Sequence, residues 1–150
     1  MVDLDNNHLK VAKSFGATDT VNSQDGKVSE KIKALTEGRG VGTAIEAVSI
    51  AETFLICQDI VAPGGVIANI GVHGHQVDLH LEKLWSQNIS ITTRLVDTVT
   101  TPTLLKTVVA NKIDPMKMIT HHFKMDKILD AYDTFGRAAE TKALKVIIES

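Results

Sequence analysis

The chain has 150 residues, of which 43% are hydrophobic and 23% charged, a composition typical of folded globular proteins that argues against disorder. The formal net charge is -2, with lysine and arginine scattered among acidic residues, which excludes the basic stripe that nucleic-acid binding needs. The single cysteine, Cys57, excludes an internal disulfide framework, and no apolar run approaches the roughly 18 residues needed to cross a membrane.

The first residues contain neither the basic region nor the apolar stretch of a signal peptide. Together with the cysteine count, this predicts a protein of the reducing cytoplasm. Along the rest of the chain, short apolar runs rich in β-branched residues alternate with segments of helical period. Such alternation is typical of βαβ units and a largely parallel sheet, so the predicted fold class is α/β.

In chain order, the first half begins with a strand over residues 1–3 and a helix that carries Leu9 and Phe15. Further strands are predicted at residues 19–22, 41–48 and 66–72, and helices at 27–35 and 51–62, with Pro63-Gly64-Gly65 as a turn.

The second half starts with a short helix at residues 81–85 and a strand at 89–95. Thr101 is the predicted N-cap of a helix that begins with Pro102, and its apolar side chains share one face: Leu104, Leu105, Val108 and Val109. A strand at 119–124, a helix capped by Asp126 and a strand at 144–148 complete the chain.

Asp3 is the most informative polar residue, because it ends the first apolar strand. In dinucleotide-binding folds, an acid at such a position accepts hydrogen bonds from the adenosine ribose, and its charge repels the 2′-phosphate of NADP. The alternative is an acid at the N-terminus of the next helix, a role for which Asp5 and Asn6 also compete.

The glycines that should precede such an acid by roughly 20 residues are not in the sequence. Gly38-Arg39-Gly40-Val41-Gly42-Thr43 resembles a glycine fingerprint, but it follows a helix, precedes a strand and has threonine at the third glycine position. This stretch is therefore interpreted as a helix stop and turn.

The residues predict neither a metal site nor a nucleophilic centre, so no catalytic residue is assigned. His73, His75 and His80 are expected in a polar loop, because zinc needs three or four convergent ligands and the one cysteine lies in an apolar helix. No serine or cysteine has a patterned histidine and acid to activate it. Cys57 is expected to be a small core residue.

A series of short stretches runs in order along essentially the whole chain, each of them common by itself. They are Val2-Asp3-Leu4-Asp5, Ala12-Lys13-Ser14-Phe15-Gly16-Ala17-Thr18, Gly40-Val41-Gly42, Ile45-Glu46-Ala47-Val48, Pro63-Gly64-Gly65, Asn69-Ile70-Gly71-Val72, Ile119-Thr120-His121 and Ala143-Leu144-Lys145-Val146-Ile147-Ile148. In their order and spacing they resemble the zinc-dependent medium-chain alcohol dehydrogenases.

The resemblance implies a set of NAD-binding residues. Asp3 matches the acid that binds the ribose, Leu4 lies beside the adenine, and His8 stands where relatives often carry a basic residue near the ribose. Lys145 would reach the pyrophosphate. The nicotinamide side would be flanked by six residues at strand ends: Ala47, Val48, Ile70, Gly71, Val72 and Leu95. Without the resemblance, core packing and a solvated strand-end charge explain the apolar group and Lys145 equally well.

The resemblance also implies what the chain lacks, because the family places its catalytic zinc ligands and phosphate-binding glycines upstream of the residues matched here. We therefore expect an incomplete Rossmann-like doubly wound parallel sheet, without its first strand and glycine-rich loop. Residues 1–95 would be a partial NAD-binding domain, and residues 96–150 a segment that in the family returns to the catalytic domain. The gap left between two strands would be closed by rearrangement or by self-association.

The sequence thus predicts a cofactor-binding fragment of an NAD-dependent, zinc-containing alcohol dehydrogenase that is inactive by itself, with zinc belonging to the intact family only. NAD binding by the fragment would be weak or absent. The predicted partners are a second copy of the chain or a separate N-terminal half, and neither nucleic acid nor a membrane. The alternative is a stand-alone interaction or assembly module that binds no nucleotide.

Overall fold

A computed structural model describes residues 1–95 and 98–150. They belong to two compact units, one made of residues 1–4 and 18–95 and the other of residues 5–17 and 98–150. The predicted domain boundary after Leu95 falls on residues 96 and 97, which lie outside the described residues. No helix in the described part has the length and apolarity that a membrane crossing requires.

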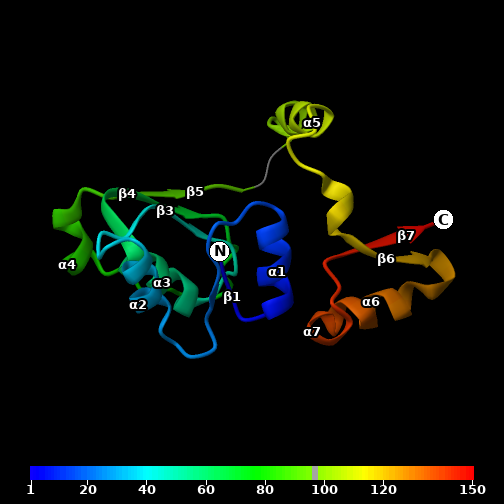
Figure 1. The fold of residues 1–150 in the computed structure, drawn as a ribbon, viewed down its shortest axis with the longest axis horizontal. Helices are drawn as coiled ribbons and strands as arrows, with labels where there is room; N and C mark the ends of the chain where they lie inside the picture. The colour runs from blue at the N-terminus through cyan, green and yellow to red at the C-terminus, as the bar shows by residue number, and fades with distance from the viewer. Residues whose placement is uncertain (96–97) are drawn as a thin grey trace. The chain divides into compact units, whose positions relative to one another are not determined.

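The first unit contains two parallel sheets (Figure 1). In the smaller one, β1 (Val2–Asp3) pairs with β2 (Val21–Asn22). In the larger one, β4 (Val61–Asn69) lies between β3 (Val41–Glu46) and β5 (Ser90–Thr93). The predicted α/β class and parallel pairing are confirmed. β1 and β3 are the strands on either side of the missing strand that was predicted. They belong to different sheets, and no described strand pairs with both of them.

Two helices cover one face of the three-stranded sheet. α3 (Ala51–Ile60) packs on β3 and β4, and α2 (Val28–Leu35) packs on α3 (Figure 1). The pairing of Ala44 with Ile67 places both side chains on this face, and they form a core with Phe54, Cys57, Ile60, Val61 and Leu84. Ile45 points to the opposite face and stays exposed, as the two-residue period of a strand requires.

The Pro63-Gly64-Gly65 stretch is an irregularity inside β4, not a turn that precedes the strand as predicted. The pairing with β3 advances from Val41 with Val61 to Thr43 with Val66, so the intervening residues of β4 bulge out. Gly64 has a φ of 75°, which a side chain would strain. The strand therefore begins at Val61 and is already paired before the glycines.

The strands also end earlier than predicted, at Glu46, Asn69 and Thr93. After β4, the N–H groups of Ile70 and Gly71 both donate to the carbonyl oxygen of Glu46, at 2.9 and 3.2 Å. This contact turns the chain out of the regular ladder. Downstream of β4, the predicted short helix is α4 (Leu81–Leu84), followed by a turn of 3₁₀-helix at Trp85–Gln87.

The second unit contains a two-stranded parallel sheet of β6 (Ile119–Lys124) and β7 (Lys145–Glu149). α6 (Ile128–Gly136) packs on both strands through Ala131, which is buried, and the short α7 (Ala138–Thr141) follows it. The unit also holds α1 (Asn6–Ser14), α5 (Thr101–Val109) and a 3₁₀ turn at Pro115–Met118.

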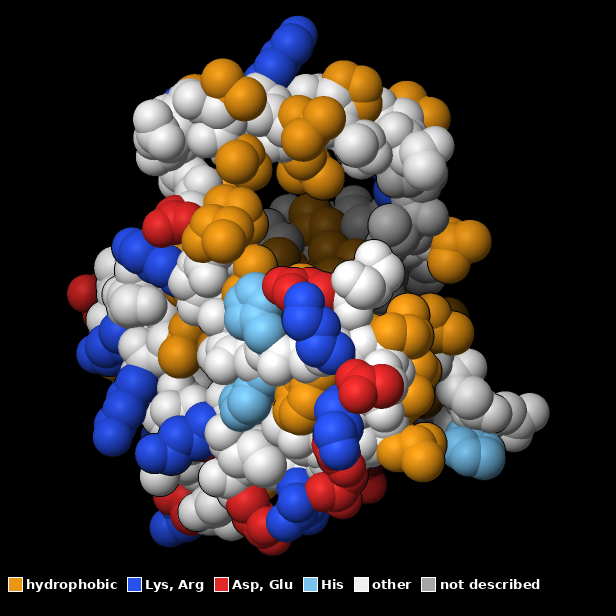
Figure 2. Space-filling view, turned by 90° about the vertical axis from the view of Figure 1, so that its right-hand side faces the viewer, with side chains coloured by type: hydrophobic (Ala, Val, Ile, Leu, Met, Phe, Trp, Pro, Cys, Tyr) orange, Lys and Arg blue, Asp and Glu red, His pale blue; other side chains and the backbone are white. Residues whose placement is uncertain are grey.

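Two predicted helix starts in this unit were wrong by a short distance. The N-cap of α5 is Thr100, so Thr101 is already helical. Asp126 lies in a 3₁₀ turn (Met125–Lys127), which leads into α6 in place of a capped start. The apolar side chains predicted on one face of α5 are largely exposed, and Figure 2 shows hydrophobic side chains along this helix at the top of the view.

Candidate functional site

The carboxyl ends of β3, β4 and β5 form one edge of the larger sheet, because the three strands are parallel neighbours. Six residues predicted to flank a nicotinamide ring follow these ends directly: Ala47, Val48, Ile70, Gly71, Val72 and Leu95. The structure therefore brings together at one edge residues that are up to about a third of the chain apart, from Ala47 to Leu95. Ligands of open α/β sheets bind beyond this kind of edge.

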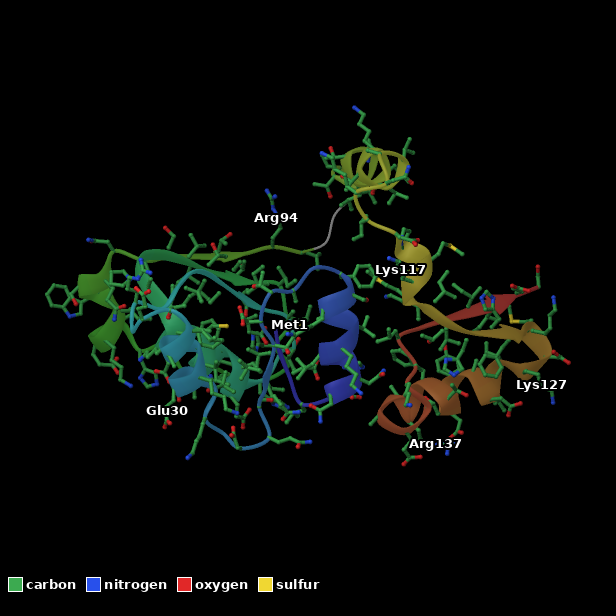
Figure 3. The ribbon with its side chains drawn as sticks, viewed as in Figure 1. Met1, Glu30, Arg94, Lys117, Lys127 and Arg137 are labelled. Carbon is green, nitrogen blue, oxygen red and sulfur yellow. The ribbon has the colours of Figure 1, made fainter. Side chains whose placement is uncertain are left out.

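The edge is apolar and accessible. Val72 is 76% exposed and Leu95 80% exposed, and Val48 and Ile70 are exposed as well. Arg94, also exposed, immediately precedes Leu95, and its side chain projects away from the sheet (Figure 3). Apolar side chains left in water at the end of a packed sheet are typical of a surface that binds a ligand or a partner.

Asp3 and Leu4 lie at the carboxyl end of β1, in the smaller sheet. The Asp3 carbonyl accepts from Ser23 N at 3.1 Å, and the Leu4 carbonyl accepts from Asn22 Nδ2 at 3.0 Å. These bonds fix the strand end on which the predicted ribose contact depends. The competing helix N-cap role belongs to Asp5, whose carboxylate accepts from Asn7 N at 2.6 Å.

Two other predicted residues belong to the second unit. His8 lies on α1 and is partly exposed, with its Nε2 3.9 Å from a carboxylate oxygen of Asp5. Lys145 is the first residue of β7 and is exposed. Their predicted roles at the ribose and the pyrophosphate stay predictions.

Glu46, at the end of β3, is a residue of this edge that was not among the predicted site residues. It is 1% exposed. Its Oε1 accepts from Val48 N and Ser49 N at 2.8 Å each and from the Thr53 hydroxyl at 2.7 Å. One carboxylate oxygen thus closes the loop after β3 onto the first turn of α3.

The second carboxylate oxygen faces the loop after β4. Oε2 of Glu46 lies 3.4 Å from Nε2 of His73, and this nitrogen forms a hydrogen bond of 2.9 Å with Asn69 Oδ1. His73 is 14% exposed and packs edge-on against Phe54, with ring centroids 5.9 Å apart. His73 lies in a loop, as predicted, since residues 70–80 form no helix or strand, but its ring turns inward to the carboxylate.

Gly71 explains how closely the two loops approach. A Cβ atom on this residue would lie 2.2 Å from Glu46 Oε2 and 2.9 Å from both the backbone nitrogen and the hydroxyl oxygen of Ser49. No side chain fits in that space. The packing of the two loops therefore requires a glycine at position 71.

The environment of Glu46 keeps it charged. Burial raises the pKa of this carboxyl group, but the hydrogen bonds from Thr53, Ser49 and Val48 and the nearby charge of His73 outweigh it, so the pKa lies below its ordinary value. Burial, together with the Glu46 charge, raises the pKa of Cys57 to about 11. Cys57 is thus a buried, protonated thiol, in agreement with the predicted core position.

The Gly38-Arg39-Gly40 stretch ends α2, as predicted. Its N–H groups are all used within the turn: Gly38 donates to Lys33 O at 2.7 Å, Arg39 to Thr36 O at 3.0 Å, and Gly40 to Thr36 Oγ1 at 3.0 Å. None of the three is left to cradle a phosphate group.

No three His, Cys, Asp or Glu side chains of residues 1–95 and 98–150 converge on a point where a metal ion could bind. The donor set of a zinc site is therefore not assembled from the described residues.

Comparison with known proteins agrees with this architecture. The sequence pattern of the family described as "Zinc-binding dehydrogenase" matches residues 1–110. An NADP-dependent isopropanol dehydrogenase of Thermoanaerobacter brockii is 35% identical over 140 residues, which cover 83% of this chain and 37% of that protein. An alcohol dehydrogenase of Cupriavidus necator is 25% identical over 155 residues, covering 99% of this chain and 41% of that protein.

Among solved structures, zinc dependent alcohol dehydrogenase 2 from Streptococcus pneumonia superposes with a TM-score of 0.95 at 53% identity. The match covers all of this chain and 44% of that one. The chain belongs to the zinc-binding dehydrogenase family and corresponds to the C-terminal portion of its zinc-dependent alcohol dehydrogenases. It spans about two fifths of the length of these two curated relatives.

Proposed function

We propose, from its membership of the zinc-binding dehydrogenases, that this chain supplies the nicotinamide-cofactor surface and C-terminal segment of an NAD-dependent alcohol dehydrogenase. The observation that carries the proposal is the shared edge of β3, β4 and β5, where exposed apolar residues follow three successive strand ends. When bound, the cofactor would accept a hydride from an alcohol carbon and leave an aldehyde or ketone.

The residues present suit the two ends of such a cofactor. The apolar side chains of Val48, Ile70 and Val72 offer a surface from which a flat nicotinamide ring can exclude water. The Asp3 carboxylate, at the end of β1, can accept hydrogen bonds from ribose hydroxyls. The phosphate-binding part has no counterpart in the Gly38-Arg39-Gly40 turn, so we expect the chain to bind NAD weakly.

Asp3 also supports NAD over NADP, because its charge repels a 2′-phosphate. The relative from Thermoanaerobacter brockii is named as NADP-dependent. We therefore infer that this chain differs from that relative in cofactor preference.

Isothermal titration calorimetry with NAD and with NADP tests this proposal. Asp3→Ala should weaken NAD binding by about tenfold, equal to about 1.4 kcal/mol, and bring the affinities for NAD and NADP together. Asp59→Ala, which removes an exposed acid of α3, is the matched control and should change neither affinity. Tighter binding of NADP than of NAD to the unsubstituted chain would contradict the proposal.

We expect the chain to be inactive by itself, because oxidation in this family needs zinc to polarise the alcohol and the described residues assemble no zinc donors. An N-terminal half that carries those donors is the proposed partner. Mixing such a half with this chain and zinc should produce NADH absorbance with a primary or secondary alcohol. Turnover by this chain without that half would refute the proposed inactivity.

The second candidate function is an interaction module without nucleotide, favoured by the exposed apolar side chains of α5. It predicts unchanged amide spectra on addition of NAD and a stable homo-oligomer in light scattering. Self-association and a cytoplasmic location stay predictions under either function.

A further inference from the structure

We propose that Glu46 is a positioning residue for the nicotinamide end of the cofactor. Its two carboxylate oxygens hold the first loop, residues 47–50, and the second loop, residues 70–73, in one common arrangement. The inference rests on the proposed function, since the two loops carry most of the apolar surface assigned to nicotinamide. It adds a buried residue whose effect on the cofactor is transmitted entirely through its neighbours.

The first loop depends on one oxygen of Glu46. The N–H groups of Val48 and Ser49 donate to Oε1 from the loop, and the Thr53 hydroxyl donates from α3. Ser49 has a φ of 79°, a conformation that a non-glycine residue adopts only when its surroundings hold it there. The hydrogen bonds to Glu46 Oε1 therefore determine the direction of the exposed Val48 side chain.

The second loop depends on the other oxygen, through a chain of two side chains. Asn69 Nδ2 donates to Gly71 O at 3.0 Å, which turns the Asn69 amide oxygen toward His73. The bond of 2.9 Å between that oxygen and His73 Nε2 then requires the proton to be on Nε2. This N–H also faces Glu46 Oε2 at 3.4 Å, so Glu46 favours a proton on Nε2.

The backbone ties the loops together at the same point. Ile70 N and Gly71 N donate to the Glu46 carbonyl, and the Gly71 Cα packs against Oε2 and Ser49 with no room for a Cβ. Neither Glu46 Oε2 nor His73 Nδ1 has a further hydrogen-bond partner within the described residues. If Glu46 is substituted, the groups that face its carboxylate find no other partner nearby, so both loops are expected to change.

Glu46→Gln is the sharpest variant, because either orientation of the new amide opposes one loop. If its NH₂ group takes the Oε2 position, it meets the proton on His73 Nε2. If it takes the Oε1 position, it meets the N–H groups of Val48 and Ser49. We expect the variant to bind NAD about tenfold more weakly, whereas ADP-ribose, which lacks nicotinamide, should bind with less than a twofold change.

Calorimetry on the 150-residue chain measures both ligands. Glu52→Gln, which alters an exposed glutamate at the start of α3, is the matched control and should leave both affinities unchanged. Equal loss of NAD and ADP-ribose binding, or no loss of NAD binding, would overturn the inference. If Glu46→Gln does not fold, His73→Phe keeps a ring against Phe54 and removes the contact to Oε2, and the same selective loss is expected.

Amide chemical shifts separate this inference from the proposed function. Thr53→Val acts on Oε1 from α3 and should shift the amides of residues 70–73, and His73→Phe should reciprocally shift Val48 and Ser49. If the chain binds neither ligand, the proposed function fails, and these shifts alone decide whether Glu46 couples the loops. Shifts confined to the loop next to each substitution would overturn the coupling.

Discussion

The helices α3 and α5 are of similar length and were both predicted from the sequence, yet their surroundings differ. In α3, the side chains of Phe54, Cys57 and Ile60 are buried in the core against the sheet. In α5, no residue is buried, and Leu104, Leu105 and Val109 are exposed. An apolar stripe thus identifies the face of a helix that requires a partner, but does not show that the chain supplies one.

The difference has an energetic consequence. Isolated helices of nine or ten residues are marginal in water, so most of their stability comes from packing. α3 obtains it from β3 and β4, and in addition its Thr53 reaches the buried carboxylate of Glu46. α5 has side-chain bonds to its own backbone, such as that from Thr107 to Thr103 O at 3.0 Å, and none of its residues is buried. Matched substitutions in the two helices should therefore have unequal effects.

The largest difference is expected from removing an aliphatic side chain of α3. Ile60 is 7% exposed and belongs to the core of the three-stranded sheet. Ile60→Ala should lower the free energy of unfolding by about 2–5 kcal/mol, because the burial is lost and a cavity remains. Urea unfolding followed by circular dichroism measures this. A loss below about 1 kcal/mol would mean that α3 is packed no better than α5.

A smaller effect, with a defined pH dependence, is expected at Thr53. Thr53→Val keeps the shape of the side chain but removes its bond to Glu46 Oε1, which should cost about 1.5–3 kcal/mol at pH 7, as for a hydrogen bond to a charged group. The folded-state pKa of Glu46 lies below its ordinary value of 4.5. Its contribution is therefore present above pH 4.5 and is lost as the pH falls through the folded-state pKa.

The cost of Thr53→Val should accordingly shrink in acid, and unfolding curves between pH 7 and pH 3 would show it. Thr107→Val on α5 is the matched control, because it removes a hydroxyl that donates to a neutral carbonyl of its own helix. Its effect should be small and independent of pH. A cost of Thr53→Val that stays constant into acid would show that Glu46 is not the charged acceptor.

Glu46 also shows where prediction from the sequence stops. Alternation in β3 places Ala44 and Glu46 on the same inward face, so a buried carboxylate could have been suspected from the period of the strand. Its partners could not, because His73 is 27 residues away and reaches it only through the register of β3 with β4. The edge residues were taken from the family resemblance, and their common place beyond the strand ends agrees with the way parallel strands align. Their role at nicotinamide stays a prediction.

The bulge in β4 escaped prediction for a related reason. Pro63-Gly64-Gly65 has turn composition, and only the pairing of Val41 with Val61 shows that the strand has already begun. In the second unit, β6 was predicted with its observed bounds, because its alternating exposure follows directly from alternating residue types. Local sequence patterns were thus sufficient to predict where helices and strands lie, whereas the contacts between distant elements could be seen only in the structure.

The smallest effect is expected on α5, and its concentration dependence tests the predicted self-association. Leu105 is 60% exposed, so Leu105→Ala should change the free energy of unfolding by less than about 0.5 kcal/mol in a monomer. If a second copy covers α5, the same substitution should cost more as the protein concentration rises, because folding is then linked to association. Thermal unfolding at several concentrations, beside light scattering, measures both quantities. A stable monomer, in which Leu105→Ala has a small effect at every concentration, would refute self-association through α5. The exposed apolar face of α5 would then be expected to bind a molecule other than a second copy of this chain.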